Sequence, residues 1–179
     1  MISELDEIVV LAQEKGELLL HGRRHVAIDM EAFIGYLNSM VGHQIADVMF
    51  TSIQYQIGKQ DCRRIRLGRL VASPIAIIDD MIRSDLSSGV GIVKVNLPQN
   101  GTDPILMELS NPCVKTILGA GRSFDFAYWA GALAVLFGTE LDVKDVTYDP
   151  ESNVKRCRLI AREIALNEKS SSAAGGCST

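Results

Sequence analysis

The sequence predicts an α+β fold in which an antiparallel sheet packs against a helical layer. Helical spacing of apolar residues dominates the first half of the chain, and paired stretches of alternating residues dominate the second half. No internal repeat or linker divides the 179 residues, a length that suits one domain with a proper core. We therefore expect a single domain over residues 1–166 and a disordered tail over 167–179, where "NEKSSSAAGGCST" has little to bury.

The chain begins with a predicted helix and a predicted hairpin. Acidic and aliphatic residues mix at helical spacing from Ile2 to Lys15, and Gly16 ends this segment. The stretch "ELLLHGRRHVAIDM" then predicts two short strands around a turn at Gly22 and Arg23.

Two helices follow, each with a start or stop signal. Asp29 is a suitable cap for a helix from Met30 to Val41, and Gly42 ends that helix. The next helix is expected over Gln44–Gly58, with its apolar residues on one stripe. That stripe comprises Ile45, Val48, Met49, Ser52, Ile53, Tyr55 and Ile57.

The rest of the chain alternates helices with hairpins. Ser73 and Pro74 form a cap and first-turn pair for a helix through Leu86. The stretch "GIVKVNLPQNGTDPILMELS" predicts an antiparallel hairpin. After "GAGRS", a helix is expected over Phe124–Phe137, closed by Gly138. A last hairpin is predicted by the alternation in "ELDVKDVTYD" and "VKRCRLIARE".

Composition argues against several classes of function. Hydrophobic residues make up 47% of the chain and charged residues 22%, which is typical of globular domains. A net charge of −4 disfavours nucleic acids and anionic membranes as partners, and no apolar run approaches the ~18 residues of a membrane span. The acidic start "MISELDEIVV" is unlike a secretory signal, and the four cysteines form no CxxC pair. We therefore expect a cytoplasmic protein with reduced thiols.

The motifs of common enzyme classes are missing. The stretch "GAGRS" lacks the lysine and the spacing of a phosphate-binding loop. The stretch "GVGIV" follows a predicted helix and precedes a strand, the reverse of the order in a dinucleotide site. No serine lies in a GxSxG setting, and HExxH is absent. The sequence thus predicts no catalytic residue and no cofactor.

The predicted helix Phe124–Phe137 is apolar on nearly every side, so it must be buried all round. It carries Gly131 in its middle, where glycine costs about 0.5–1 kcal/mol relative to alanine. Close approach of another backbone or of a ligand would explain this glycine. The helix therefore forms the centre of the core, or it also lines a pocket, and the periodicity leaves both alternatives open.

The order of these elements resembles the 4-vinyl reductase domain, also described as a hydrocarbon-binding domain. Three stretches between about His21 and Arg162 carry the resemblance. They are "GRRHVAIDMEAFIGYLNSMVGHQIADVMFTSIQYQIGKQ", "GVGIVKV…ILMELSNPCV" and "AYWAGALAVLFGTELDVKDVTYDPESNVKRCRLI". The resemblance implies an α+β domain related in fold to vesicle-tethering complex subunits and haem-based nitric oxide sensors. Members often dimerise and hold small apolar molecules internally, and the sensor domains of phenol- and toluene-responsive transcription activators belong to the same group.

The resemblance implies that the apolar helix is both core and pocket wall. The candidate ligand-binding residues are Phe124, Tyr128, Trp129 and Gly131. Many members also hold zinc with two cysteines, but Tyr148 stands at the first of these positions and only Cys157 matches the second. Because one thiolate does not build a four-ligand zinc site, no metal is expected.

The leading functional hypothesis is a domain that binds or senses a small apolar or aromatic ligand without catalysis of its own, and that acts through a separate signalling partner. Two alternatives stay open. One is an enzyme or accessory in tetrapyrrole vinyl reduction, suggested by the family's name. The other is an assembly or scaffold protein, by analogy with the tethering subunits. A homodimer is also expected, because the helices over Met30–Val41 and Gln44–Gly58 carry more apolar surface than one small sheet covers.

Overall fold

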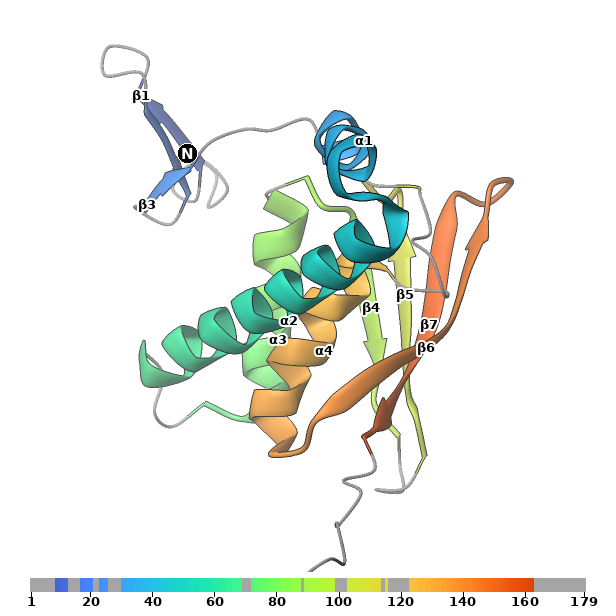
Figure 1. Ribbon diagram of the computed structural model, residues 1–179. Coiled ribbons are helices and arrows are strands. Elements are labelled where there is room, and N and C mark those ends of the chain that lie inside the picture. Colours follow the sequence, from blue (N-terminus) through green and yellow to red (C-terminus); the bar gives the residue numbers. More distant parts are fainter. Residues whose placement is uncertain are drawn as a thin grey trace, which may run out of the picture.

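The structure, a computed structural model, confirms the predicted α+β class, with helices packed on an antiparallel sheet (Figure 1). It describes residues 9–12, 17–20, 23–25, 30–68, 72–87, 89–98, 103–113, 115 and 123–162. The expected domain boundary at residue 166 and the expected tail over 167–179 lie outside these residues.

Three N-terminal strands form an antiparallel sheet in the order β1-β2-β3. They are β1 (Val9–Ala12), β2 (Glu17–Leu20) and β3 (Arg23–His25). The predicted hairpin is confirmed, since Leu20 pairs with Arg23, but Arg23, predicted in the turn, belongs to β3. Gly22, the other predicted turn residue, lies outside the described residues. The predicted helix Ile2–Lys15 is wrong over β1, because the β-branched Val9 and Val10 favour extended backbone and β2 offers it a partner. The remainder of that predicted helix is not among the described residues.

The two long N-terminal helices meet at a sharp corner. α1 (Met30–Val41) ends as predicted at Gly42, whose φ of +82° is a left-handed conformation that favours glycine. α2 (His43–Gly68) begins at once and runs past the predicted end at Gly58. The polar residues after Gly58 are good helix formers, so the glycine does not stop the helix. The proposed cap Asp29 lies outside the described residues.

Most of the apolar stripe predicted on α2 faces outward, whereas its member Tyr55 is partly buried against the main core. Its aliphatic members and Met49 are between 39% and 57% exposed. The opposite face of the helix is buried, and it consists of Ala46, Asp47, Phe50, Gly58 and Cys62. Small residues on that face allow the close helix crossing described below, which apolar periodicity alone does not reveal.

The middle of the chain follows the prediction. α3 (Pro74–Ser87) begins with the expected cap, since the backbone N–H of Ala76 donates to Ser73 Oγ at 3.3 Å. β4 (Ile92–Asn96) and β5 (Ile105–Ser110) then pair as the predicted antiparallel hairpin.

The C-terminal third also follows the prediction. α4 (Phe124–Phe137) has the expected bounds, and Gly138 closes it in the left-handed region with φ +69°. β6 (Leu141–Asp149) and β7 (Val154–Ala161) form the last hairpin. The sheet order β4-β5-β7-β6 leaves β4 and β6 at its two edges.

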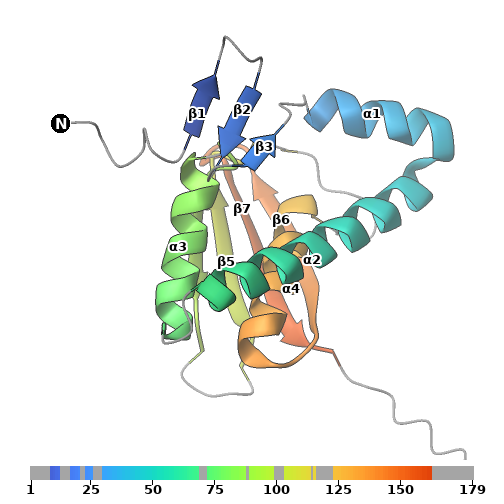
Figure 2. The ribbon, with the colours of Figure 1, turned by 90° about the vertical axis from the view of Figure 1, so that its left-hand side faces the viewer.

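The helices lie on one side of this four-stranded sheet (Figures 1 and 2). α4 lies between α2 and the sheet, which explains why its middle is buried on every side. The main core consists of side chains from α4, from α3 and from the inner face of the sheet. A smaller cluster of Ile34, Ala46 and Phe50 joins α1 to α2. Within the described residues, no helix combines the length and apolar character needed to cross a bilayer.

Candidate functional site

The single tryptophan of the chain lies at the centre of the main core. Trp129 is only 1% exposed, and its indole N–H donates to Asp85 Oδ2 on α3 at 2.7 Å. The pair links the central helix to α3 by a polar contact within the main hydrophobic core.

Asp85 is a buried carboxyl, at 7% exposure. Burial raises its pKa to about 7, and the negative charges of Asp125 and Asp61 add to this effect. The hydrogen bond from Trp129 acts in the opposite direction because it stabilises the carboxylate. Near neutral pH, Asp85 can therefore exist as an acceptor-only carboxylate or as a carboxylic acid that also donates.

The other predicted aromatic residues divide between the two clusters. Tyr128 packs edge-on against Trp129, with ring centroids 6.2 Å apart, and burial raises the pKa of its hydroxyl. Phe124 instead packs against Phe50, again at 6.2 Å, beside the smaller α1–α2 cluster. The structure thus brings Tyr128 and Trp129 together and places Phe124 against α1 and α2.

Gly131 lies where α4 crosses α2. A Cβ atom added there would stand 1.9 Å from the backbone oxygen of Tyr55, and one added at Gly58 would stand 1.9 Å from that of Tyr128. The two glycines therefore form a reciprocal crossing in which the backbones touch. The close approach expected from the sequence is confirmed, and the neighbour that makes it is the backbone of α2.

A buried ion pair lies at the first turn of α4. Lys155 Nζ on β7 is 3.2 Å from Asp125 Oδ2, and the two side chains are 0% and 1% exposed. Burial raises the pKa of Asp125, and the charge of Lys155 opposes that rise. The sequence did not predict this pair, although the alternation of β7 places Lys155 on the same core face as Cys157 and Leu159.

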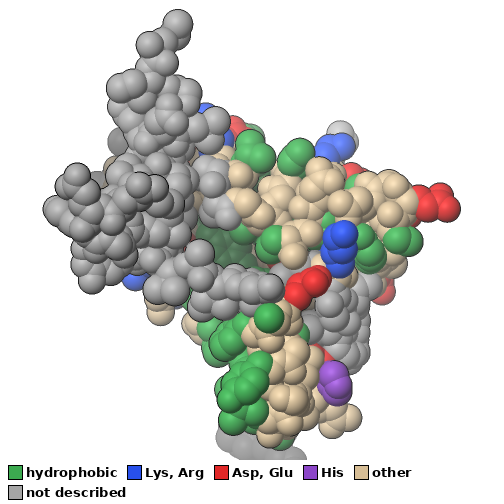
Figure 3. All heavy atoms as spheres, turned by 90° about the horizontal axis from the view of Figure 1, so that it is seen from above, with side chains coloured by type: hydrophobic (Ala, Val, Ile, Leu, Met, Phe, Trp, Pro, Cys, Tyr) green, Lys and Arg blue, Asp and Glu red, His purple; other side chains and the backbone are tan. Residues whose placement is uncertain are grey.

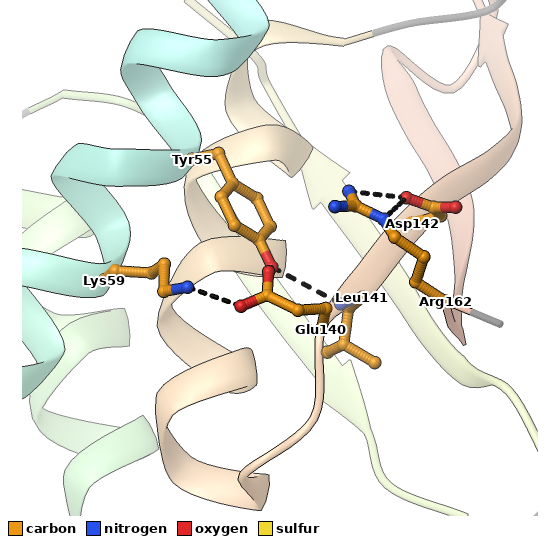
Figure 4. Close-up of polar contacts among 6 residues, drawn as sticks. All are labelled: Tyr55, Lys59, Glu140, Leu141, Asp142 and Arg162. Atoms are coloured by element: carbon orange, nitrogen blue, oxygen red, sulfur yellow. Dashed lines mark hydrogen bonds and ion pairs between the residues drawn. The ribbon is translucent and has the colours of Figure 1, made fainter. Parts of the chain in front are cut away.

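An open groove of about 980 Å³ runs between α2 and β6, and Ser123 and Ala127 of the α4 region also line it. A polar cluster occupies it (Figure 4). The Tyr55 hydroxyl donates to Glu140 Oε2, and Lys59 Nζ donates to Glu140 Oε1 at 2.6 Å. At the neighbouring position, Arg162 Nε donates to Asp142 Oδ1 at 2.8 Å.

This polar cluster suits binding and positioning better than acid–base chemistry. Burial and the bond to Glu140 raise the pKa of Tyr55 to about 12. The hydrogen bonds from Lys59 and Tyr55 lower the pKa of Glu140. Both shifts move the pKa values of these groups away from neutral pH, and a general acid or base is most effective when its pKa lies near neutral pH.

No protein-family model matches the chain, and no curated protein matches it. A structural match is found with the phenol-responsive sensory domain of the transcription activator PoxR, in its structure with phenol. The TM-score is 0.66 at 13% identity, over 89% of this chain and 88% of the other. The chain therefore shares the fold of that domain.

The two positions at which the resemblance implies zinc cysteines are Tyr148 and Cys157. The Tyr148 hydroxyl donates to Asn153 Oδ1 at 2.7 Å, and burial raises the pKa of the Cys157 thiol. Among the residues that the structure describes, three or more potential ligands nowhere gather in a metal-binding group. The expectation of a metal-free domain stays a prediction.

Asp85 was missed by sequence analysis. A carboxylate at the end of an amphipathic helix is normally solvated, and only the fold places this one against a tryptophan of α4. One feature of the sequence does indicate burial of Asp85. It follows Met81 by four residues, which places it on the same, buried face of α3.

Proposed function

We propose that this chain is a sensory domain that binds a small apolar or aromatic molecule inside the fold, beside α4. The observation that carries the proposal is the Asp85–Trp129 pair, a polar contact of 2.7 Å within an apolar core. Ligand sites of this kind are mostly apolar and fix the ligand with a few polar groups. Perturbed carboxyls such as Asp85 also concentrate at functional sites.

The pair can recognise a ligand hydroxyl in two ways. The carboxylate of Asp85 accepts a hydrogen bond from it, or the indole N–H of Trp129 donates to its oxygen. The ring of Tyr128 supplies an aromatic wall on the same helix. We assign Gly131 to the helix crossing and Phe124 to the contact with Phe50 of α2. Tyr128 and Trp129 are therefore the predicted residues that we retain for ligand contact.

A ligand at this position needs space that core side chains now fill. Met81 and Met107 are 0% and 1% exposed and belong to the same cluster as Trp129. Methionine is unbranched and changes rotamer easily, so these two side chains are suited to rearrange around a small guest.

The shared fold supports phenol as the first probe, since the matching domain of PoxR is described as phenol-responsive. The wild-type chain and the variants Trp129→Phe and Asp85→Asn would be titrated with phenol and with toluene by calorimetry. We expect the dissociation constant for phenol to rise at least 10-fold in both variants. The dissociation constant for toluene should change by less than about 3-fold in Asp85→Asn, because toluene has no hydroxyl.

Phe137→Leu is the matched control, because this residue lies on the same helix but is 42% exposed. Absence of heat with either probe at millimolar concentration would contradict the proposal. An equal loss of binding in Phe137→Leu would do so as well.

The finer expectations from the sequence belong to the same proposal. We propose membership of the 4-vinyl reductase family, a cytoplasmic location, a single domain over residues 1–166 and output through a separate signalling partner. The resemblance in element order supports the family, and the shared sensory-domain fold supports the signalling role. The homodimer expected from the sequence is proposed too.

A further inference from the structure

The outer edge of β6 forms one side of the groove between α2 and β6. Six consecutive residues of this strand, 141–146, line the groove. Successive side chains of a strand point to opposite faces of its sheet, so a cavity that touches all six residues lies against the edge of the strand. The sheet order leaves β6 at this edge, and no strand in the described part of the chain pairs with its outer side. The groove is therefore bordered by main chain as well as by side chains.

The ladder between β6 and β7 shows which main-chain groups face the groove. Just before β6, the carbonyl of Glu140 accepts a hydrogen bond from the N–H of Arg162 at 2.8 Å, so Glu140 directs its main chain toward β7. This direction alternates along an antiparallel strand, so Leu141 and Val143 direct theirs into the groove. The N–H of Leu141 accordingly donates to the Tyr55 hydroxyl at 3.4 Å (Figure 4). Val143 has no such side-chain partner among the described residues.

The side chains of the groove suit an uncharged main chain. Lys59 is paired with Glu140 and Arg162 with Asp142, so a charged guest would have to break an existing pair. Ser123 also lines the groove, and its hydroxyl is buried without a hydrogen-bond partner among the described residues. A buried hydroxyl without a partner is costly, and the N–H or C=O of a bound peptide would supply one.

We propose that this groove binds a short extended segment of another protein, which adds to the edge of β6 as a further strand. In strand addition, main-chain hydrogen bonds supply affinity and alternate side chains supply specificity. The main chain of Val143 is the pairing point, and the irregularity after Lys144 limits the regular stretch to Leu141–Lys144. The residue that pairs with Val143 directs its side chain toward Val48 of α2, so every second residue of the segment is apolar. The site excludes Trp129, so it stands or falls separately from the proposed sensory function.

Hydrogen exchange in the free chain gives the first test, because it requires no partner. Exchange rates of the main-chain amides are measured by NMR on the ¹⁵N-labelled full chain. We expect the Val143 amide to exchange at least 10-fold faster than the amides of Asp142 and Lys144, which point toward β7. Equal protection of the three amides would mean that this chain or a second copy already covers the edge, and it would overturn the proposal.

Binding is tested with a synthetic heptapeptide in which valine alternates with threonine between a terminal lysine and a terminal glutamate. Titration into the labelled chain should shift the β6 amides in a saturable manner, with a dissociation constant below 1 mM. An N-methyl group on the central valine removes an N–H that pairs with β6, and it should raise this constant at least 10-fold. The same group on a threonine, whose N–H points away from β6, should change it less than about 3-fold. No shift at millimolar peptide, or equal binding of the two methylated peptides, overturns the proposal.

A first pair of variants tests the pairing point on β6. Val143→Pro removes the N–H that faces the groove and keeps the ladder with β7, since an edge strand accepts proline at an outward-facing N–H. We expect it to raise the dissociation constant of the heptapeptide at least 10-fold. Val143→Ala keeps the N–H and should raise the constant less than about 3-fold. Equal constants in the two variants would contradict pairing at Val143.

A second pair of variants tests the wall of α2. Hydrophobic side chains also gather along one side of the corner between α1 and α2 (Figure 3), so binding there has to be distinguished. Val48 and Ile53 are 47% and 50% exposed on α2, and of the two only Val48 lines the groove. We expect Val48→Lys to weaken heptapeptide binding at least 10-fold and Ile53→Lys less than about 3-fold.

Near-ultraviolet circular dichroism verifies that each variant is folded. If Val143→Pro unfolds, the methylated peptides and the lysine variants on α2 still decide the outcome. Equal weakening by Val48→Lys and Ile53→Lys overturns the proposal, and so do peptide-induced shifts confined to α3 and the Trp129 indole.

Discussion

Individual ionisable residues are buried around α4, and their environments set how the domain responds to pH. Asp85 lies against Trp129, while Asp125 lies against Lys155. Removing such groups from water is costly, so each depends on the hydrogen bonds and charges that the fold places beside it.

Asp85 gives the first prediction. Its pKa rises from 3.8 in the unfolded chain to about 7 in the folded state. Between these two pH values, the folded state keeps a proton that the unfolded state has already released. Stability contributed by this group is therefore lost as pH rises through 7. The side chain in Asp85→Asn does not titrate. We therefore expect the free energy of unfolding of this variant, relative to that of the wild type, to be roughly 2 kcal/mol higher at pH 8 than at pH 5. Urea unfolding at the two pH values measures this, and a constant difference would contradict it.

The Lys155–Asp125 pair gives the second prediction. Lys155→Met leaves a carboxyl buried without this cation, and we expect a loss of about 3–5 kcal/mol in the free energy of unfolding. The double variant Lys155→Met/Asp125→Leu removes both charges and should recover most of that loss. Chemical denaturation of the wild type, both single variants and the double variant completes the cycle. A double variant no more stable than Lys155→Met would show that the charges are not coupled.

At the scale of elements, the crossing of α2 and α4 fixes the geometry of the helical layer. The sequence predicted both helices, the exact bounds of α4 and the close approach at Gly131. It could not predict the partner, because periodicity along one helix carries no information about which distant backbone touches it. For the same reason the sequence left open which face of α2 is buried, and that face includes the small residues Ala46, Gly58 and Cys62.

The crossing gives the third prediction. Gly131→Ala places a methyl group 1.9 Å from the Tyr55 carbonyl oxygen, so the helices must separate, and we expect a loss of about 1–3 kcal/mol or more. Gly35→Ala is the control, because a Cβ there has nothing within 4 Å and should gain about 0.5–1 kcal/mol through helix propensity. Thermal unfolding of both variants measures the difference. Stabilisation by Gly131→Ala would refute the contact.

At the scale of the whole molecule, one helix connects the proposed ligand site to the rest of the helical layer. α4 carries Trp129 on the side of α3, and it touches α2 through Gly131 on another side. α2 in turn exposes apolar side chains, among them Met49 and Ile53, to solvent. The alternating hairpins and the order of elements sufficed to predict this architecture, whereas the Asp85–Trp129 contact depends on packing between segments 44 residues apart.

The central claim is that a small aromatic molecule binds beside Trp129. Because the chain has one tryptophan, ¹⁵N-labelled protein gives one indole N–H resonance, which reports directly on the hydrogen bond to Asp85. Titration with phenol should shift this resonance in a saturable manner, together with backbone amides of α3 and the middle of α4. An indole resonance that stays in place at millimolar phenol, or shifts confined to the groove between α2 and β6, would contradict the account.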